Sequence, residues 1–167
     1  MELIETCIPG VVIVQPRIFG DERGYFFESF SQRDFERQVC KTVFVQDNES
    51  KSCYGVVRGL HFQQPPYAQS KLVRVVKGRV LDVAVDIRKN SPTFGQWRSC
   101  LLTEENKRQF YVPEGFAHGF SVLSQEAVFA YKCTALYDPT DEGGIMYNDP
   151  QLNIDWQIPE GVEVLLS

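Results

Sequence analysis

The stretches "GVVRGLHF", residues 55–62, and "VPEGFAHGF", residues 112–120, contain both histidines of the chain. Each combines a histidine with preceding glycines in a run rich in valine, leucine or phenylalanine. Their spacing is that of a metal site built on β-strands, but some of the ligands that such a site needs are missing. The two stretches therefore decide the expected fold and raise the question of what the altered site does.

The rest of the chain also has the pattern of a β-protein. Short runs rich in valine, phenylalanine and tyrosine alternate with turn residues, for example Lys77–Gly78. Only residues 31–39 and 103–109 resemble helices, with Ser31 and Thr103 as the respective N-caps. Many short strands at short intervals predict a sandwich or a barrel. The expected strands are residues 10–16, 42–47, 71–87, 109–113, 119–124 and 127–137.

Length and composition are those of an ordinary globular protein. The chain has 167 residues, of which 43% are hydrophobic and 23% charged, so we expect a single domain over residues 1–167. The net charge of −5 argues against nucleic acid or an anionic membrane as a partner. No apolar run approaches the ~20 residues that span a bilayer. The N-terminus lacks a basic signal region and the five cysteines form no CxxC pair, so we expect a cytoplasmic protein with reduced thiols.

The first histidine stretch resembles one of the two sequence patterns of the cupin barrel, G-x5-HxH-x3,4-E-x6-G. Gly55 and His61 match the opening of this pattern, but Gln63 takes the place of the second histidine. Lys71 lies seven residues before Gly78, at the spacing where the metal-binding glutamate is expected. Two of the metal ligands are therefore replaced, one by an amide and one by an ammonium.

The second stretch resembles the other cupin pattern, G-x5-PxG-x2-H-x3-N. Pro113, Gly115 and His118 match its core, while Val122 replaces the final asparagine. The resemblance implies an all-β cupin fold, which is a double-stranded β-helix or jelly-roll barrel, with a few short helices.

The replaced ligands change the chemistry that is expected of the site. A divalent cation needs several nitrogen or oxygen ligands on one side, and an ammonium in their midst would repel it. We therefore expect no bound metal and no cofactor. Lys71 could instead hold a positive charge beside a developing oxyanion, and a histidine could act as a base. These groups suit the abstraction of a proton next to a carbonyl.

A structural role is the competing interpretation of the same residues. His61 and His118 could be hydrogen-bonded structural histidines, and Lys71 could be a solvated strand end. On a later strand, alternation places Tyr131 and Tyr137 on one face, where one phenol could donate a proton and the other could stack on a ring. Both could also be core tyrosines with satisfied hydroxyls. Two histidines and a lysine at motif spacing favour the functional interpretation.

Over essentially its whole length the sequence resembles the dTDP-4-dehydrorhamnose 3,5-epimerase family, whose members are cupin-fold enzymes of dTDP-L-rhamnose synthesis. The resemblance implies a cofactor-independent isomerase that inverts C3 and C5 of dTDP-4-keto-6-deoxy-D-glucose to give dTDP-4-keto-L-rhamnose. The segments that carry it are "FGDERGYFFESF" (19–30), "FVQDNESKS" (44–52), residues 55–97 from "GVVRGLHF" to "TFGQW", "ENKRQFYVPEGFAHGF" (105–120) and "NIDW" (153–156).

The resemblance also implies roles for the residues that match the family's motifs. His61 would be the general base that removes the protons at C3 and C5. Lys71 would stabilise the enolate oxygen at C4, and Tyr131 would reprotonate the opposite face. The other implied contacts are Arg58 with the diphosphate, Tyr137 stacked on the thymine, Gln46, Asp47 and Asn48 with the nucleotide, His118 at the sugar and Glu142 at the pocket rim.

In this family, the segment that matches residues 19–30 contributes to the active site of the neighbouring subunit. The resemblance therefore implies a homodimer with shared sites, in which Phe19, Arg23, Phe26 and Glu28 act across the interface. Arg23 would contact a phosphate and Glu28 would lie near the base. Without the resemblance, this charged turn would be interpreted as solvated surface.

The base histidine of the family is oriented by an aspartate in a segment resembling S-x-K-D. The sequence given ends with "VEVLLS" at Ser167, where that segment would begin. Within these residues, Asp82 is the best candidate for charge pairing inside the barrel, on a strand face shared with Ala84 and Asp86. We expect Asp82 to pair with Lys71 rather than with His61.

Three other functions are open on the sequence alone. One is a relative in the same fold that inverts only C3 or acts on another nucleotide; Tyr131 at the donor position favours full epimerase chemistry but does not decide between them. Another is a non-catalytic sugar-nucleotide-binding module, which would wash no deuterium into the substrate. The third is a metal-dependent oxygenase, which Gln63 and Lys71 disfavour.

Overall fold

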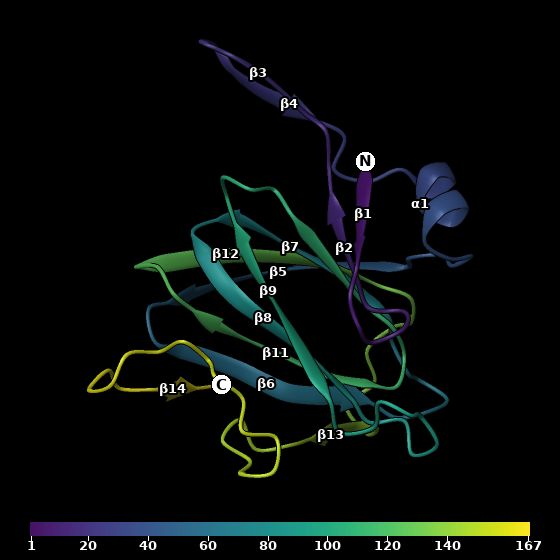
Figure 1. Ribbon diagram of the computed structural model, residues 1–167, viewed down its shortest axis with the longest axis vertical. Helices are drawn as coiled ribbons and strands as arrows, with labels where there is room; N and C mark the ends of the chain where they lie inside the picture. The colour runs from purple at the N-terminus through teal and green to yellow at the C-terminus, as the bar shows by residue number, and fades with distance from the viewer.

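The computed structural model describes all 167 residues and consists mainly of β-strands in two facing sheets (Figure 1). The first sheet has the strand order β1-β2-β10-β7-β12-β5, and the second has the order β13-β6-β11-β8-β9 with β14 beside β6. A separate hairpin is formed by β3 and β4. The elements are β1 Glu2–Glu5, β2 Val12–Gln15, β3 Ile18–Asp21, β4 Gly24–Phe27, α1 Gln32–Gln38, β5 Gln46–Cys53, β6 Val56–Gln63, β7 Lys71–Lys77, β8 Arg79–Asp86, β9 Trp97–Thr103, β10 Gln109–Val112, β11 Phe116–Val122, β12 Glu126–Cys133, β13 Glu142–Gly144 and β14 Leu165–Leu166.

The main hydrophobic core lies between the two sheets. Val73 and Phe129 enter it from the first sheet, and Val80 and Phe120 enter it from the second. The rings of Phe120 and Phe129 stack with their centroids 4.2 Å apart, which joins the two layers. Complete burial of a side chain of this size contributes roughly 1.5–3 kcal/mol. The predicted all-β jelly-roll fold is confirmed as a sandwich of two sheets.

The outer face of the second sheet is covered by the chain that follows β13. Trp156 packs there against Val57, Leu81 and Val83. The Trp156 indole donates to the Tyr147 carbonyl oxygen at 2.7 Å, so the covering segment is held in a fixed shape. Because this segment covers the sheet, the residues of β8 that point away from the sandwich interior, such as Leu81 and Val83, are apolar.

The outer face of the first sheet is covered by α1. The predicted helix and its cap are confirmed, because the Ser31 hydroxyl accepts a hydrogen bond from the Asp34 amide at 3.3 Å. Phe35 is buried between Phe44 and the ring of Tyr111. None of the chain's helical structure is long and apolar enough to span a membrane.

The second predicted helix, at residues 103–109, is wrong. Thr103 does accept a hydrogen bond from the Asn106 amide at 2.9 Å, as an N-cap would, but only one turn forms. Lys107 has a φ of 54°, which ends the turn, and β10 begins at Gln109. Burial of β10 against β7 outweighs the local capping signal. The strand expected from residue 42 also begins later, at Gln46.

The hairpin between β7 and β8 fixes the positions of two charged residues inside the barrel. Its predicted turn at Lys77–Gly78 is confirmed, with a φ of 83° at Gly78. A Cβ at Gly78 would lie 2.1 Å from the Glu126 carbonyl oxygen, so only glycine fits. Lys71 and Asp82 then lie on the two arms of this hairpin, one in each sheet.

Candidate active site

A cavity of about 400 Å³ opens between the two sheets at one end of the sandwich. Its walls are β5, β7 and β12 of the first sheet and β6 and β13 of the second. Alternation explains why β6 turns His61 and Gln63 to the same side, two residues apart. The lining residues are Gln46, Asn48, Glu49, His61, Phe62, Gln63, Gln69, Lys71, Tyr131, Tyr137 and Glu142.

The three predicted catalytic residues, His61, Lys71 and Tyr131, meet in this cavity from three different strands. Lys71 opens β7 opposite Cys133 of β12, and Tyr131 lies two residues earlier on β12. The Lys71 ammonium lies 5.6 Å from the centroid of the Tyr131 ring. One base, one cation and one phenol therefore face the same small volume.

The environment of His61 keeps its imidazole neutral. Burial lowers its pKa from 6.5 to about 3, and the charge of Lys71 acts in the same direction. The ring lies edge-on to that of His118, with centroids 6.2 Å apart. Because the neutral form of histidine is the one that accepts a proton, His61 is ready to act as a base at neutral pH.

Lys71 and Tyr131 are perturbed by the same burial. It lowers the pKa of Lys71, an effect that Cys133, Asp82 and Glu142 oppose. Burial also raises the pKa of the half-buried Tyr131 phenol, which therefore keeps its proton at neutral pH. The cavity thus contains a proton acceptor and a proton donor on different strands.

The predicted pairing of Asp82 with Lys71 is wrong as a direct contact. The Asp82 carboxylate is hydrogen-bonded to the Nε2 atom of His118, at 2.8 and 2.9 Å from its two oxygens. Both side chains are buried behind the cavity rather than in its wall. His118 has this partner because β11 pairs with β8, and alternation turns both side chains inward. Asp82 does share its strand face with Ala84, as expected.

The cavity mouth is shaped by the segment between β12 and β13. The Gln46 side-chain oxygen accepts a hydrogen bond from the Tyr137 amide at 3.2 Å, and that of Gln63 accepts one from the Asp138 amide at 3.0 Å. The Tyr137 hydroxyl donates to Glu142 at 2.9 Å. Gln63, at the position of a metal ligand in the cupin pattern, therefore anchors a loop.

Besides His118, two further predicted substrate contacts lie outside the cavity wall. Asp47 points to the opposite face of β5, where its carboxylate pairs with the Lys132 ammonium at 3.0 Å. The Arg58 guanidinium donates to the Ser52 hydroxyl at 3.0 Å, close enough to the cavity for its charge to lower the pKa of His61. Both are adjacent to the site without lining it.

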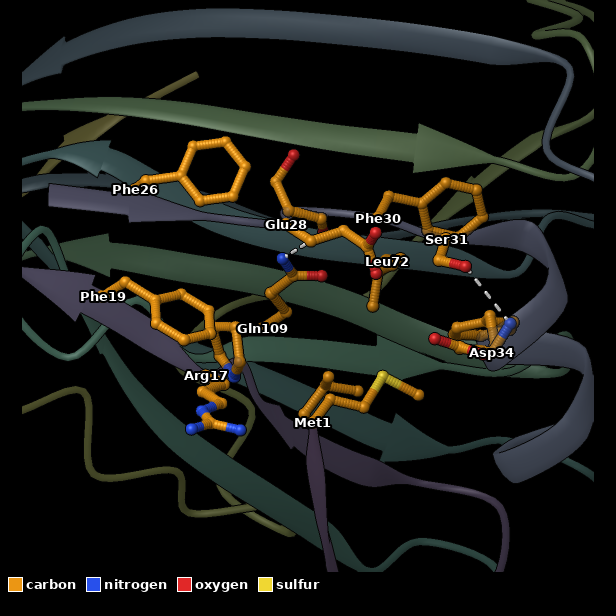
Figure 2. Close-up of a pocket in the computed structure, with 14 residues that line it drawn as sticks. Met1, Arg17, Phe19, Phe26, Glu28, Phe30, Ser31, Asp34, Leu72 and Gln109 are labelled. Atoms are coloured by element: carbon orange, nitrogen blue, oxygen red, sulfur yellow. Dashed lines mark hydrogen bonds between the residues drawn. The ribbon is translucent and has the colours of Figure 1, made fainter.

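The four residues expected to act across a subunit interface lie far from His61 within the chain. They belong to the β3–β4 hairpin and the residue after it, and the hairpin projects from the sandwich at the top of Figure 1. Arg23 pairs with Asp21 at the hairpin tip, at 2.6 Å. Phe19, Phe26 and Glu28 line a second cavity of about 290 Å³ at the hairpin base, where Gln109 is hydrogen-bonded to the Ser29 carbonyl oxygen at 2.6 Å (Figure 2).

Three cavity residues, Glu49, Phe62 and Gln69, were not predicted as site residues from the sequence. The Gln69 amide donates to the Ala135 carbonyl oxygen at 2.8 Å and so supports the same mouth segment. It precedes Lys71 by two positions, so extending the strand alternation back from Lys71 could have identified it. Phe62 lies between two inward positions of β6, and no pattern in the sequence marks it.

Comparison with known proteins gives consistent results. Residues 5–167 match the family model described as dTDP-4-dehydrorhamnose 3,5-epimerase. The protein of that name from Shigella flexneri is 58% identical over 159 residues, which cover 95% of this chain and 88% of the relative. A Legionella pneumophila 3,5-epimerase, solved in complex with dTDP-4-keto-L-rhamnose, has a TM-score of 0.95 and 54% identity, covering 99% of this chain and 87% of that one. A 3'-monoepimerase from Streptomyces bikiniensis, in complex with dTDP-quinovose, has a TM-score of 0.89 and 33% identity, covering 97% of this chain and 81% of that one.

Proposed function

Since the chain belongs to the dTDP-4-dehydrorhamnose 3,5-epimerase family, we propose that it inverts C3 and C5 of dTDP-4-keto-6-deoxy-D-glucose to give dTDP-4-keto-L-rhamnose. The observation that carries the proposal is the meeting of His61, Lys71 and Tyr131 in one cavity. The reaction would serve dTDP-L-rhamnose biosynthesis. We place it in the cytoplasm, because all five cysteines are free thiols.

In the proposed mechanism, neutral His61 removes the proton from the carbon next to the C4 ketone. The electron pair of that C–H bond moves to the C4 oxygen, where the Lys71 ammonium stabilises the enolate. Tyr131 then gives its proton to the opposite face of the same carbon, which inverts the centre. Exchange with solvent returns a proton to Tyr131 and removes one from His61 before the second centre reacts.

The energetics favour this division of roles. A proton next to a ketone is too weakly acidic for imidazole to remove fast without help. Each ~1.4 kcal/mol by which the enolate is stabilised raises the rate tenfold. A fixed ammonium in a buried cavity can supply several such increments, because charges interact more strongly where water is excluded.

The remaining substrate contacts stay proposals that follow from the family. Gln46 and Asn48 line the cavity beside the expected nucleotide, and Tyr137 at its mouth has an exposed ring that can stack on thymine. Arg58 would hold the diphosphate. The other proposed contacts are Asp47 at the nucleotide, Glu142 at the rim and His118 behind the sugar.

We also propose that the protein works as a homodimer in which the β3–β4 hairpin completes the partner's site. The hairpin exposes apolar rings, with Phe19 52% and Phe26 70% accessible. Such rings on a projecting element are typical of an interaction surface. Arg23 at its tip would bring a positive charge to the diphosphate, and Glu28 would lie near the base.

Mixing two inactive variants tests this arrangement. Arg23→Ala and His61→Ala should each be inactive as homodimers. Random exchange of equal amounts should restore about one quarter of wild-type activity, because half of the dimers are mixed and each mixed dimer has one intact site of two. The measurement is epimerase activity after exchange, which differently tagged subunits can monitor. No recovery under demonstrated exchange would show that the sites are not shared.

The experiment that tests the main proposal is NMR of dTDP-4-keto-6-deoxy-D-glucose incubated with the protein in D2O. Deuterium should enter at both C3 and C5, and the product should be dTDP-4-keto-L-rhamnose. Incorporation at C3 alone would indicate the monoepimerase activity of the Streptomyces bikiniensis relative. Binding without incorporation would indicate a sugar-nucleotide-binding module.

Tyr131→Phe should separate proton exchange from inversion. Without the phenol, the enolate can be reprotonated only from the His61 side, so deuterium exchange should continue while inversion falls roughly 10²- to 10⁴-fold, as for the loss of a general acid. Following both signals by NMR checks this. Tyr137→Phe, the same change at the cavity mouth, should alter the KM but not the ratio of exchange to inversion. Wild-type inversion by folded Tyr131→Phe would remove Tyr131 from the mechanism.

A further inference from the structure

A carboxylate and an imidazole, hydrogen-bonded to each other, are buried in the apolar core behind the cavity. Asp82 has no exposed surface, and His118 is only 4% exposed. The surrounding core includes Val80, Phe120 and Phe129. An isolated carboxylate in such surroundings is strongly destabilising unless it is hydrogen-bonded and paired with a positive charge. The pair therefore needs an explanation beyond packing.

The geometry of the pair indicates which group is charged. The His118 Nε2 atom is almost equidistant from the two Asp82 oxygens, at 2.8 and 2.9 Å. One N–H group donating to both oxygens of a carboxylate fits these distances, whereas a protonated acid would donate from one oxygen only. Burial lowers the pKa of His118, and the Lys71 charge lowers it further, so the imidazole is neutral. Burial raises the pKa of Asp82, and the Lys71 ammonium lowers it.

Lys71 is buried on the other arm of the β7–β8 hairpin, and its positive charge is the one that lowers the pKa of Asp82. Three acidic groups oppose the effect of burial on the pKa of Lys71: the Cys133 thiol from β12, Asp82 from β8 and Glu142 from β13. Burial raises the pKa of Cys133, so the thiol is neutral, and Glu142 lies at the exposed mouth and accepts a hydrogen bond from Tyr137. The other titratable or charged groups around the cavity are the exposed Glu49 on β5, Arg58 and His61 on β6, His118 on β11, Tyr131 on β12 and Tyr137 after β12.

Asp82 itself faces few other groups. His118 donates to it, Lys71 acts on it through charge, and Cys100 of β9 is opposite it in the ladder. Burial raises the pKa of Cys100 to about 12, so this thiol adds no charge. Asp82 is therefore the one buried carboxylate that can balance the ammonium of Lys71.

We propose that Asp82 and His118 are positioning residues that keep Lys71 protonated behind the reacting carbonyl. The inference rests on the proposed epimerase function. Asp82 supplies the counter-charge, and the His118 N–H group holds the carboxylate in place without itself titrating. His118 is then fixed in one tautomer and does not act as a second base. Lys71 is then protonated before the substrate binds, so the enolate forms beside a positive charge.

The test is the titration of Lys71 in wild type and in Asp82→Asn. The asparagine keeps the shape and can still accept from His118, but it removes the charge. The Lys71 pKa, followed by NMR of lysine labelled with ¹³C at the ε-carbon, should fall by roughly 1 to 3 pH units, the usual effect of losing a nearby opposite charge. Asp86→Asn is the matched control, because Asp86 lies on the same strand face and is also fully buried but bonds to Arg88, Ser91 and Thr93. An unchanged Lys71 pKa in Asp82→Asn would overturn the proposal.

Kinetics provide a second readout. At neutral pH, the kcat of Asp82→Asn should fall about tenfold or more, and it should recover as the pH is lowered and Lys71 regains its proton. A purely structural role predicts a loss that lower pH does not restore. The NMR titration needs no turnover, so it tests the pair even if deuterium incorporation by the wild-type protein contradicts the epimerase proposal.

Should Asp82→Asn fail to fold, two changes at His118 give the same test. The amide of His118→Gln can still donate to Asp82, whereas the side chain of His118→Leu cannot. The pKa of Lys71 should be closer to that of the wild type in His118→Gln than in His118→Leu. Equal values in these two variants would contradict a positioning role for His118.

Discussion

His61→Ala is expected to abolish deuterium exchange at both C3 and C5. The neutral imidazole is the only histidine that lines the cavity together with Lys71 and Tyr131, and loss of a general base costs roughly 10²- to 10⁴-fold in rate. The measurement is NMR of the substrate in D2O, with the melting temperature measured beside it. A structural role would instead predict that stability and activity are lost together. Continued exchange at either centre at the wild-type rate would assign that centre to a different base.

The pKa of His61 adds a pH dependence to this prediction. Histidine accepts a proton only in its neutral form, which is populated above its pKa. Since burial and Lys71 lower this pKa from 6.5 to about 3, the wild-type rate should not fall between pH 7 and pH 5 through protonation of His61. An acid limb with a midpoint near 6.5 in the profile of kcat/KM would contradict the described environment of the base.

Lys71→Met is expected to reduce exchange at C3 and C5 together, because both centres share the same enolate oxygen. Removal of one charge-stabilising group typically costs roughly 10²- to 10³-fold in rate. Methionine fills a similar volume without a charge, and an ammonium buried among strands is costly to desolvate. The same change also leaves the buried Asp82 carboxylate without its counter-charge, so the melting temperature is measured beside the exchange rate of the folded protein.

The exchange rate of the folded fraction makes the Lys71 test decisive. If Lys71 were a structural residue, its replacement would lower the melting temperature and leave the chemistry of the folded fraction intact. A conservative control is Lys77→Met at the exposed end of the same strand, where the side chain pairs with Glu126 outside the cavity. It should leave exchange at both centres unchanged.

The spacing of the sequence motifs predicted the cavity because strand alternation is a local property. Once β6 is assigned, His61 and Gln63 must face the same side, and the same reasoning brings Tyr131 inward on β12. The hydrogen-bond partners of a side chain on other strands do not follow from alternation. Alternation placed Asp82 inside the barrel, but only the pairing of β8 with β11 decides that His118 rather than Lys71 is its hydrogen-bond partner.

Local signals also failed where tertiary burial opposed them. The capping pattern at Thr103 is satisfied in the structure, yet the chain turns once and continues as β10, since β10 pairs with both β2 and β7. The positions of Phe19 and Arg23 could not be derived from local pattern either. A hairpin with a charged tip has the same sequence signature whether it meets solvent or a second chain.

The two glutamine anchors at the cavity mouth have a consequence for substrate entry. Gln46 belongs to the first sheet and Gln63 to the second, and they hold the neighbouring amides of Tyr137 and Asp138. A hydrogen bond of this kind contributes about 1 kcal/mol net, so releasing both costs about 2 kcal/mol. At equilibrium, roughly one molecule in thirty then lacks both of these anchors while both sheets stay folded. We therefore expect the mouth segment to loosen for a nucleotide sugar by releasing side-chain hydrogen bonds, without the unfolding of a strand.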